Sequence, residues 1–66
     1  MRYEFRVVGA VSAALGAAFP ELTARAGLAA GTTFFGPVLD SAQLHGLLDR
    51  FHALGLTVVE LRQLPD

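Results

Sequence analysis

The two ends of the chain both have the pattern of a β-strand. In residues 2–7 apolar and charged side chains alternate, which is typical of a strand with one buried face. The apolar positions are Tyr3, Phe5 and Val7, and the charged positions are Arg2, Glu4 and Arg6. Residues 56–61 form a second strand-like segment. The residues between these two segments must therefore allow the first and last strands of the chain to join one sheet.

The first half of the intervening chain predicts a helix and a hairpin. After Gly9, Ser12 is a candidate N-cap for a short helix that Pro20 ends. Residues 22–28 predict a strand, the Ala30-Gly31 pair suits a turn, and residues 32–35 suit a returning strand. The apolar positions of this helix are Val11, Leu15, Ala18 and Phe19.

A second helix has clearer signals at both ends. Asp40 is the expected N-cap with Gln43 at N3, and Leu39 is expected to pack on Leu44 as a hydrophobic staple. Gly55 supplies the left-handed position after the helix, followed by the apolar Leu56. One apolar stripe follows the 3.6-residue repeat. It consists of Leu44, Leu47, Leu48, Phe51 and Leu54.

The order of these elements is β-α-β-β-α-β. It predicts an α+β fold of the ferredoxin-like split βαβ type, in which an antiparallel four-stranded sheet carries two helices on one face because the crossovers are right-handed. We expect residues 1–66 to form a single domain of this kind. The other face of the sheet is then open.

Small size makes self-association the expected route to stability. A chain of 66 residues without cysteine has no disulfide to offset an ordering cost of about 1.5 kcal/mol per residue. Hydrophobic residues make up 53% of the chain, which excludes disorder, and the net charge of −1 gives no general attraction to nucleic acid. We therefore expect a homo-oligomer, most simply a dimer, with another protein as the alternative partner and no nucleic-acid or membrane partner. The apolar run 7–19 is shorter than the roughly 18 residues that span a membrane and is Ala- and Gly-rich rather than Leu-rich, so a cytoplasmic location is expected.

Some segments carry a resemblance to known proteins. The Tyr3-Glu4-Phe5-Arg6-Val7-Val8-Gly9, Ala18-Phe19-Pro20, Gln43-Leu44-His45-Gly46-Leu47-Leu48 and Leu54-Gly55-Leu56 segments resemble short ferredoxin-like hypothetical proteins of high-GC Gram-positive bacteria. This resemblance implies no activity. More distantly, Val8-Gly9-Ala10-Val11 is similar to ACT regulatory domains. That similarity implies an amino-acid ligand near Gly9 and Val11.

The open face is the expected interface. Phe34 and Phe35 are adjacent in one strand and must point to opposite faces, as must Val58 and Val59. One Phe and one Val are therefore expected beside arginines on the uncovered face. The predicted interface residues are Arg2, Arg6, Phe35, Val58 and Arg62.

Catalytic and metal sites are not expected. His45, Asp49 and His52 share a stripe of the second helix, but the helical wheel places this stripe at the helix edge in water, where a solvated face is the simpler interpretation. No cofactor is predicted. The sequence thus predicts a non-enzymatic homo-oligomeric accessory or regulatory binding module that associates through the open face or an edge strand. The alternative is an ACT-like metabolite sensor.

Overall fold

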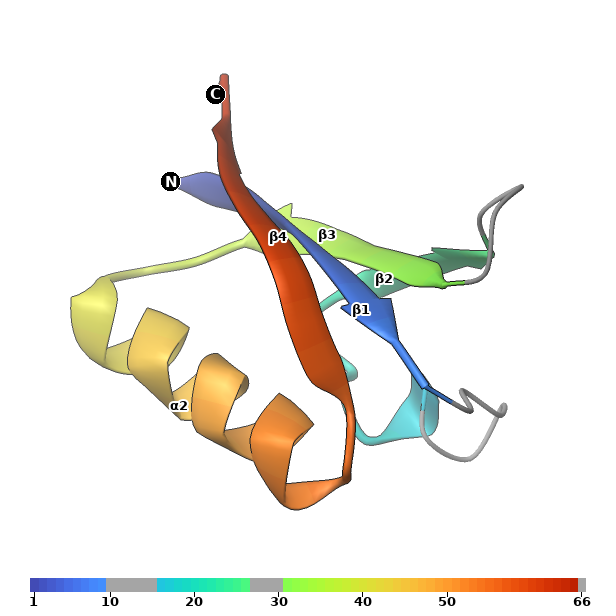
Figure 1. Ribbon diagram of the computed structural model, residues 1–66. Helices are drawn as coiled ribbons and strands as arrows, with labels where there is room; N and C mark the ends of the chain where they lie inside the picture. Colours follow the sequence, from blue (N-terminus) through green and yellow to red (C-terminus); the bar gives the residue numbers. More distant parts are fainter. Residues whose placement is uncertain (10–15, 27–30, 66) are drawn as a thin grey trace.

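The computed structural model describes residues 1–9, 16–26 and 31–65 of the chain (Figure 1). The strands form one antiparallel sheet in the order β2-β3-β1-β4, so that β1 and β3 are central and β2 and β4 are the edges. The elements are β1 (Arg2–Val8), β2 (Thr23–Ala26), β3 (Thr32–Pro37), α2 (Ser41–Ala53) and β4 (Thr57–Leu64).

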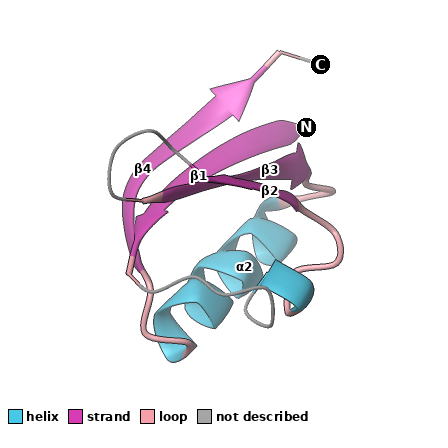
Figure 2. Ribbon diagram, turned by 90° about the vertical axis from the view of Figure 1, so that its right-hand side faces the viewer, coloured by secondary structure: helices cyan, strands magenta, loops and turns pink. Residues whose placement is uncertain are grey.

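The predicted fold with two helices on one face of the sheet is wrong. Within the described residues a single helix, α2, packs against the sheet (Figure 2). The predicted first helix, with its Ser12 cap, falls largely on residues 10–15, outside the described residues. Gly16 and Ala17 are helical, and the chain then turns so that Phe19 is buried in the core. Apolar spacing alone could not show whether this segment forms a packed helix or brings one aromatic ring to the core.

The core lies between α2 and the facing side of the sheet. Phe51 of α2 is at its centre: its ring stacks on Phe19 at 4.3 Å between centroids and contacts Phe34 at 5.1 Å and Phe5 at 5.3 Å. The predicted burial of Phe5 and Val7 in β1 is confirmed, with Tyr3 partly buried beside them. The buried hydrophobic residues are Phe5, Val7, Phe19, Phe34, Val38, Leu47, Phe51 and Leu56.

Both predicted ends of α2 are confirmed. The Gln43 backbone N–H donates to Asp40 Oδ1 at 2.8 Å, and the Leu39 N–H donates to Gln43 Oε1 at 2.6 Å. At the other end the Gly55 N–H donates to His52 O and the Leu56 N–H to Phe51 O, which is the Schellman arrangement. The staple from Leu39 to Leu44 is wrong, because Leu39 is 85% exposed.

The strand boundaries differ from those expected at the two sheet edges. β2 begins at Thr23, one residue later than the predicted 22–28 segment, and residues 27 and 28 lie outside the described part of the chain. β4 is longer than predicted and runs to Leu64. The register between β1 and β4 shifts between Arg6 and Val7, where Arg6 faces Glu60 but Val7 faces Val58. Val59 is therefore the extra residue of a β-bulge.

Candidate interface at the open face and the β4 edge

The face of the sheet opposite α2, here called the open face, carries the charged residues of β1. Arg2, Glu4 and Arg6 point there because Phe5 and Val7, which alternate with them, are in the core. Phe35 of β3 is paired with Glu4 and is also on this face, half-buried, while Phe34 is in the core. The structure therefore brings together four of the predicted interface residues. They are Arg2, Arg6, Phe35 and Arg62.

Val58 does not belong to this group. It pairs with Val7 and packs against the core, so its side chain is on the α2 side of the sheet. Strict alternation from Leu61 gives the wrong face for the preceding valines because the bulge adds one residue to β4. Val59, the bulge residue, is 50% exposed.

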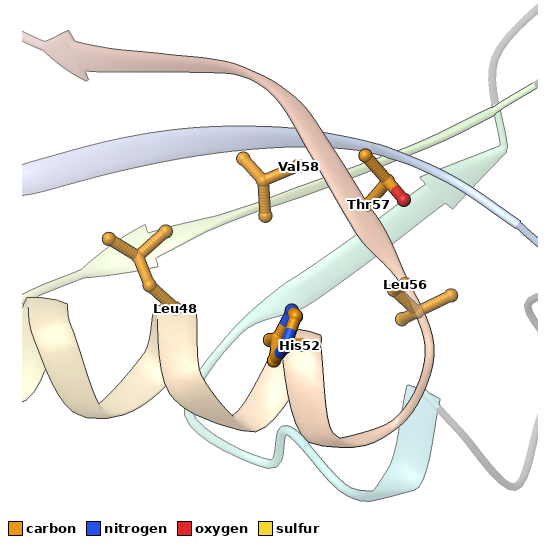
Figure 3. Close-up of a pocket in the computed structure, with 5 residues that line it drawn as sticks. All are labelled: Leu48, His52, Leu56, Thr57 and Val58. Carbon is orange, nitrogen blue, oxygen red and sulfur yellow. The ribbon is translucent and has the colours of Figure 1, made fainter.

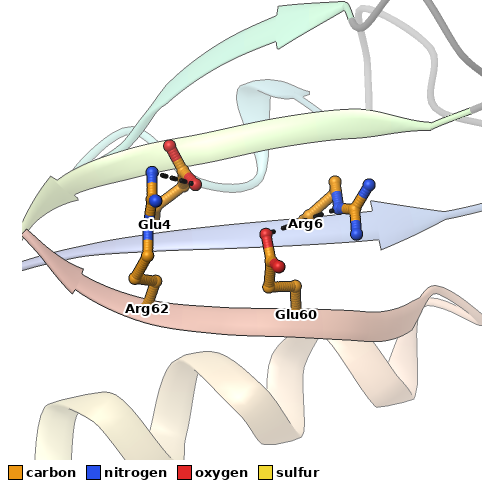
Figure 4. Close-up of polar contacts among 4 residues, drawn as sticks. All are labelled: Glu4, Arg6, Glu60 and Arg62. Atoms are coloured by element: carbon orange, nitrogen blue, oxygen red, sulfur yellow. Dashed lines mark hydrogen bonds and ion pairs between the residues drawn. The ribbon is translucent and has the colours of Figure 1, made fainter.

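Two ion pairs cross from β1 to β4 on the open face (Figure 4). Arg62 Nη2 donates to Glu4 Oε1 at 3.2 Å, and Arg6 Nε is 3.6 Å from Glu60 Oε1. The Arg62 and Arg6 side chains are 63% and 52% exposed, so each pair contributes less than about 1 kcal/mol to folding. These pairs fix the positions of the charges more than they stabilise the domain.

The open face is positively charged although the chain is not. Among the described residues, four of the five arginines and two of the five acidic residues are on it. Arg25 of β2 belongs to this set, since it pairs with Thr33, which in turn pairs with Arg6. Its guanidinium lies 5.4 Å from the centroid of the Phe35 ring, a cation–π distance. The open face of one copy would therefore repel the open face of another.

The β4 edge combines exposed backbone with exposed apolar side chains. β4 pairs with β1 on one side only and is the longest strand of the described residues (Figure 1). Leu61, which faces Phe5 across the strands, is 41% exposed. Leu61 and Glu60 were not predicted interface residues, and Val59 entered only as the alternative to Val58. Their role depends on the position of β4 at the sheet edge, which the sequence did not reveal.

A shallow pocket of about 390 Å³ lies between α2 and β4 (Figure 3). Its wall is largely apolar. The lining residues are Leu48, His52, Leu56, Thr57 and Val58. His45, Asp49 and His52 are all exposed on α2. Within the described residues no group of three or more His, Asp or Glu side chains is arranged to hold a metal ion.

The predicted ligand loop begins with a glycine that packing explains. A Cβ built on Gly9 would lie 3.0 Å from Leu56 Cδ2, and Gly9 has a φ of +133°. The positive φ favours glycine at this position, and a Cβ would in addition require Leu56 Cδ2 to shift by a few tenths of an ångström. Val11, the other predicted ligand residue, is outside the described residues.

One ion pair lies away from the open face and joins α2 to the chain before β2. Arg50 Nη1 donates to Glu21 Oε1 at 2.9 Å and to Ala18 O at 3.1 Å, and its guanidinium lies 5.3 Å from the centroid of the Phe19 ring. Hydrogen bonding from the backbone of Glu21, followed by the hydrogen bond and charge of Arg50, lowers the pKa of Glu21 below 4.5 against an opposing effect of burial. This contact is structural, because it holds Phe19 against the core.

Together these features define a small antiparallel-sheet domain with one covering helix, an open face and a free edge strand. The chain belongs to the family described as a domain of unknown function (DUF8691), whose model matches residues 2–62. No curated protein and no solved structure matches the chain significantly. Among the described residues no helix is long and apolar enough to cross a membrane.

Proposed function

We propose that this domain is a non-enzymatic, homo-oligomeric accessory or regulatory binding module of the cytoplasm. The observation that carries the proposal is the one-sided cover of the sheet. α2 covers one face, and the opposite face and the β4 edge have no cover from the described residues (Figure 2). Of these two surfaces, the β4 edge, with its exposed apolar side chains, is suited to burial against another copy in a chain with so few residues to form a core.

The size of the core supports the same proposal. Eight hydrophobic residues are buried in the described part of the chain, and β4 presents Val59 and Leu61 at 50% and 41% exposure. Domains of this length are at the margin of independent stability, and association offsets part of the entropy lost on folding. A second copy that covers β4 would bury apolar surface that the monomer leaves in water.

Sedimentation equilibrium of the wild-type protein from about 1 to 100 μM tests this proposal. Specific dimers with modest interfaces have dissociation constants in or below this range. We expect a mass above that of the 7.0 kDa chain, and a melting temperature that rises with protein concentration. A folded species of 7.0 kDa at every concentration would contradict the proposal.

A further inference from the structure

The β4 strand has the properties of an edge that pairs with another strand. A free edge presents a row of backbone N–H and C=O groups that can continue the sheet, and proteins that avoid such pairing place Lys, Pro or β-bulges in the strand or keep it short. β4 contains neither Lys nor Pro and has eight residues. The bulge at Val59 is its one interruption.

Two identical strands that pair antiparallel must obey a two-fold axis. For an edge strand this axis is perpendicular to the sheet, because only that rotation reverses the strand and keeps the same face of both sheets on the same side. One residue of β4 then lies opposite itself. The residues on either side of it lie opposite each other.

The charges of β4 distinguish between the possible positions of the two-fold axis along the strand. If Leu61 is at the axis, Glu60 of each copy lies opposite Arg62 of the second copy on the open face. If Glu60 or Arg62 is at the axis, two like charges meet, which is unfavourable for directly opposed residues. Of these three registers, the one centred on Leu61 is therefore the one that matches opposite charges.

The ion pairs within each copy extend this match. Arg6 is paired with Glu60, and Glu4 with Arg62, across β1 and β4 (Figure 4). In the Leu61-centred register each row across the open face reads Arg6, Glu60, then Arg62 and Glu4 of the second copy. Positive and negative side chains thus alternate over four strands.

On the α2 side the same register places two leucines together. Leu61 is 41% exposed in the single chain and would lie directly opposite Leu61 of the second copy. Its Cβ atoms in such a pair are about 4.5 to 5.5 Å apart, close enough for the side chains to pack. The pairing covers residues 59–63, with the bulge residue Val59 opposite Gln63.

We infer that two copies of this chain associate antiparallel along β4, with Leu61 at the two-fold axis and Glu60 paired with Arg62 of the second copy. This inference rests on the proposed function, because it names the surface through which the oligomer forms. The occupant of the edge is a second copy rather than a different strand because β4 is complementary to itself. Face-to-face association is disfavoured by the excess of arginine on the open face.

Charge reversal with mixing tests the register. Glu60→Arg puts two arginines opposite each other in the dimer, and Arg62→Glu puts two glutamates opposite each other. Each variant should therefore bind itself at least about tenfold more weakly than wild type. A one-to-one mixture should regain wild-type affinity, because in the mixed dimer both arginines on β4 of one variant lie opposite the two glutamates on β4 of the other.

Arg25→Glu is the matched control, since it makes the same charge change as Arg62→Glu but on β2 at the opposite edge. All four proteins and the mixture are measured by sedimentation equilibrium, with circular dichroism melts to establish folding. Wild-type affinity in Arg25→Glu, weakening in both β4 variants and recovery in the mixture support the inference.

Three results overturn it in distinguishable ways. A monomeric wild type contradicts the proposed function itself. A dimeric wild type that Arg25→Glu weakens as much as Arg62→Glu assigns association to the open face instead of the edge. A mixture of the two β4 variants that binds no more tightly than either variant alone excludes the Leu61-centred register while the oligomer stands.

Discussion

At the scale of single residues, Arg50 does the most to join parts of the chain that are distant in sequence. Its guanidinium reaches from α2 to Glu21 and to the carbonyl of Ala18, and it covers the ring of Phe19. Phe19 in turn stacks on Phe51. The sequence predicts the buried Phe19 and Phe51 from their apolar spacing, but not Arg50, because a long-range ion pair leaves no local pattern.

Glu21 should contribute stability that depends on pH. Its pKa is lowered in the folded state, so its contribution is complete above the unfolded value near 4.5 and is lost as the pH falls through the folded value. Glu21→Gln keeps the shape and removes the charge, and should lower the free energy of unfolding at pH 7 by less than about 1 kcal/mol, because the pair is partly exposed to water.

Urea unfolding of the wild type and of Glu21→Gln, at one protein concentration and a series of pH values, measures this pH-dependent contribution. The two curves of stability against pH should converge below the lowered pKa of Glu21. A difference that stays constant over the whole range would show that the charge of Glu21 does not stabilise the fold.

At the scale of elements, α2 is the part of the structure that the sequence predicts best. Its N-cap at Asp40 and its Schellman end at Gly55 are local signals, set by residues within a few positions of each terminus. The predicted first helix lies largely on residues 10–15, outside the described residues, and what the sequence could not show there is that the chain after Ala17 turns to bury Phe19. The face of Val58 was misassigned because a bulge depends on the partner strand and cannot be read from β4 alone.

Two glycines, one within α2 and one just after it, should respond in opposite directions to substitution by alanine. Gly55 has a φ of +78° and Gly46 lies within α2, and a Cβ on either would meet nothing within 4 Å. Gly55→Ala should therefore destabilise the fold by about 1 kcal/mol through the left-handed backbone alone. Gly46→Ala should stabilise it by about 0.5 to 1 kcal/mol through helix propensity.

Thermal and urea unfolding of the two variants beside wild type give the sign of each change in the free energy of unfolding directly. Because neither methyl group contacts other atoms, packing cannot account for a difference between them. Shifts in the same direction would contradict the assigned end of α2.

At the scale of the whole molecule, the one-sided cover of the sheet explains why two copies should associate. α2 hides the hydrophobic face, the open face carries most of the arginines, and the described residues leave β4 as an uncovered edge. Alternation alone could place Arg2, Arg6 and Arg62 on the open face, whereas the choice of Phe35 over Phe34 needed the register between β1 and β3. The β4 edge could not be predicted from alternation, because which strand lies at an edge is decided by the order of strands in the sheet.

The most direct test of association along β4 is disulfide formation in Leu61→Cys. The chain has no cysteine of its own, so any disulfide must join two copies, and two residues directly opposed in antiparallel strands have a Cα separation that a disulfide can bridge. Leu39→Cys is the control, since Leu39 is 85% exposed and lies outside β4.

Under mild oxidation at micromolar concentration, nonreducing gels should show Leu61→Cys as a covalent dimer well before Leu39→Cys. The Leu61→Cys dimer should also keep the circular dichroism spectrum of the wild-type protein. Equal and slow cross-linking of the two variants would contradict the claim that two copies of this chain meet at Leu61 along β4.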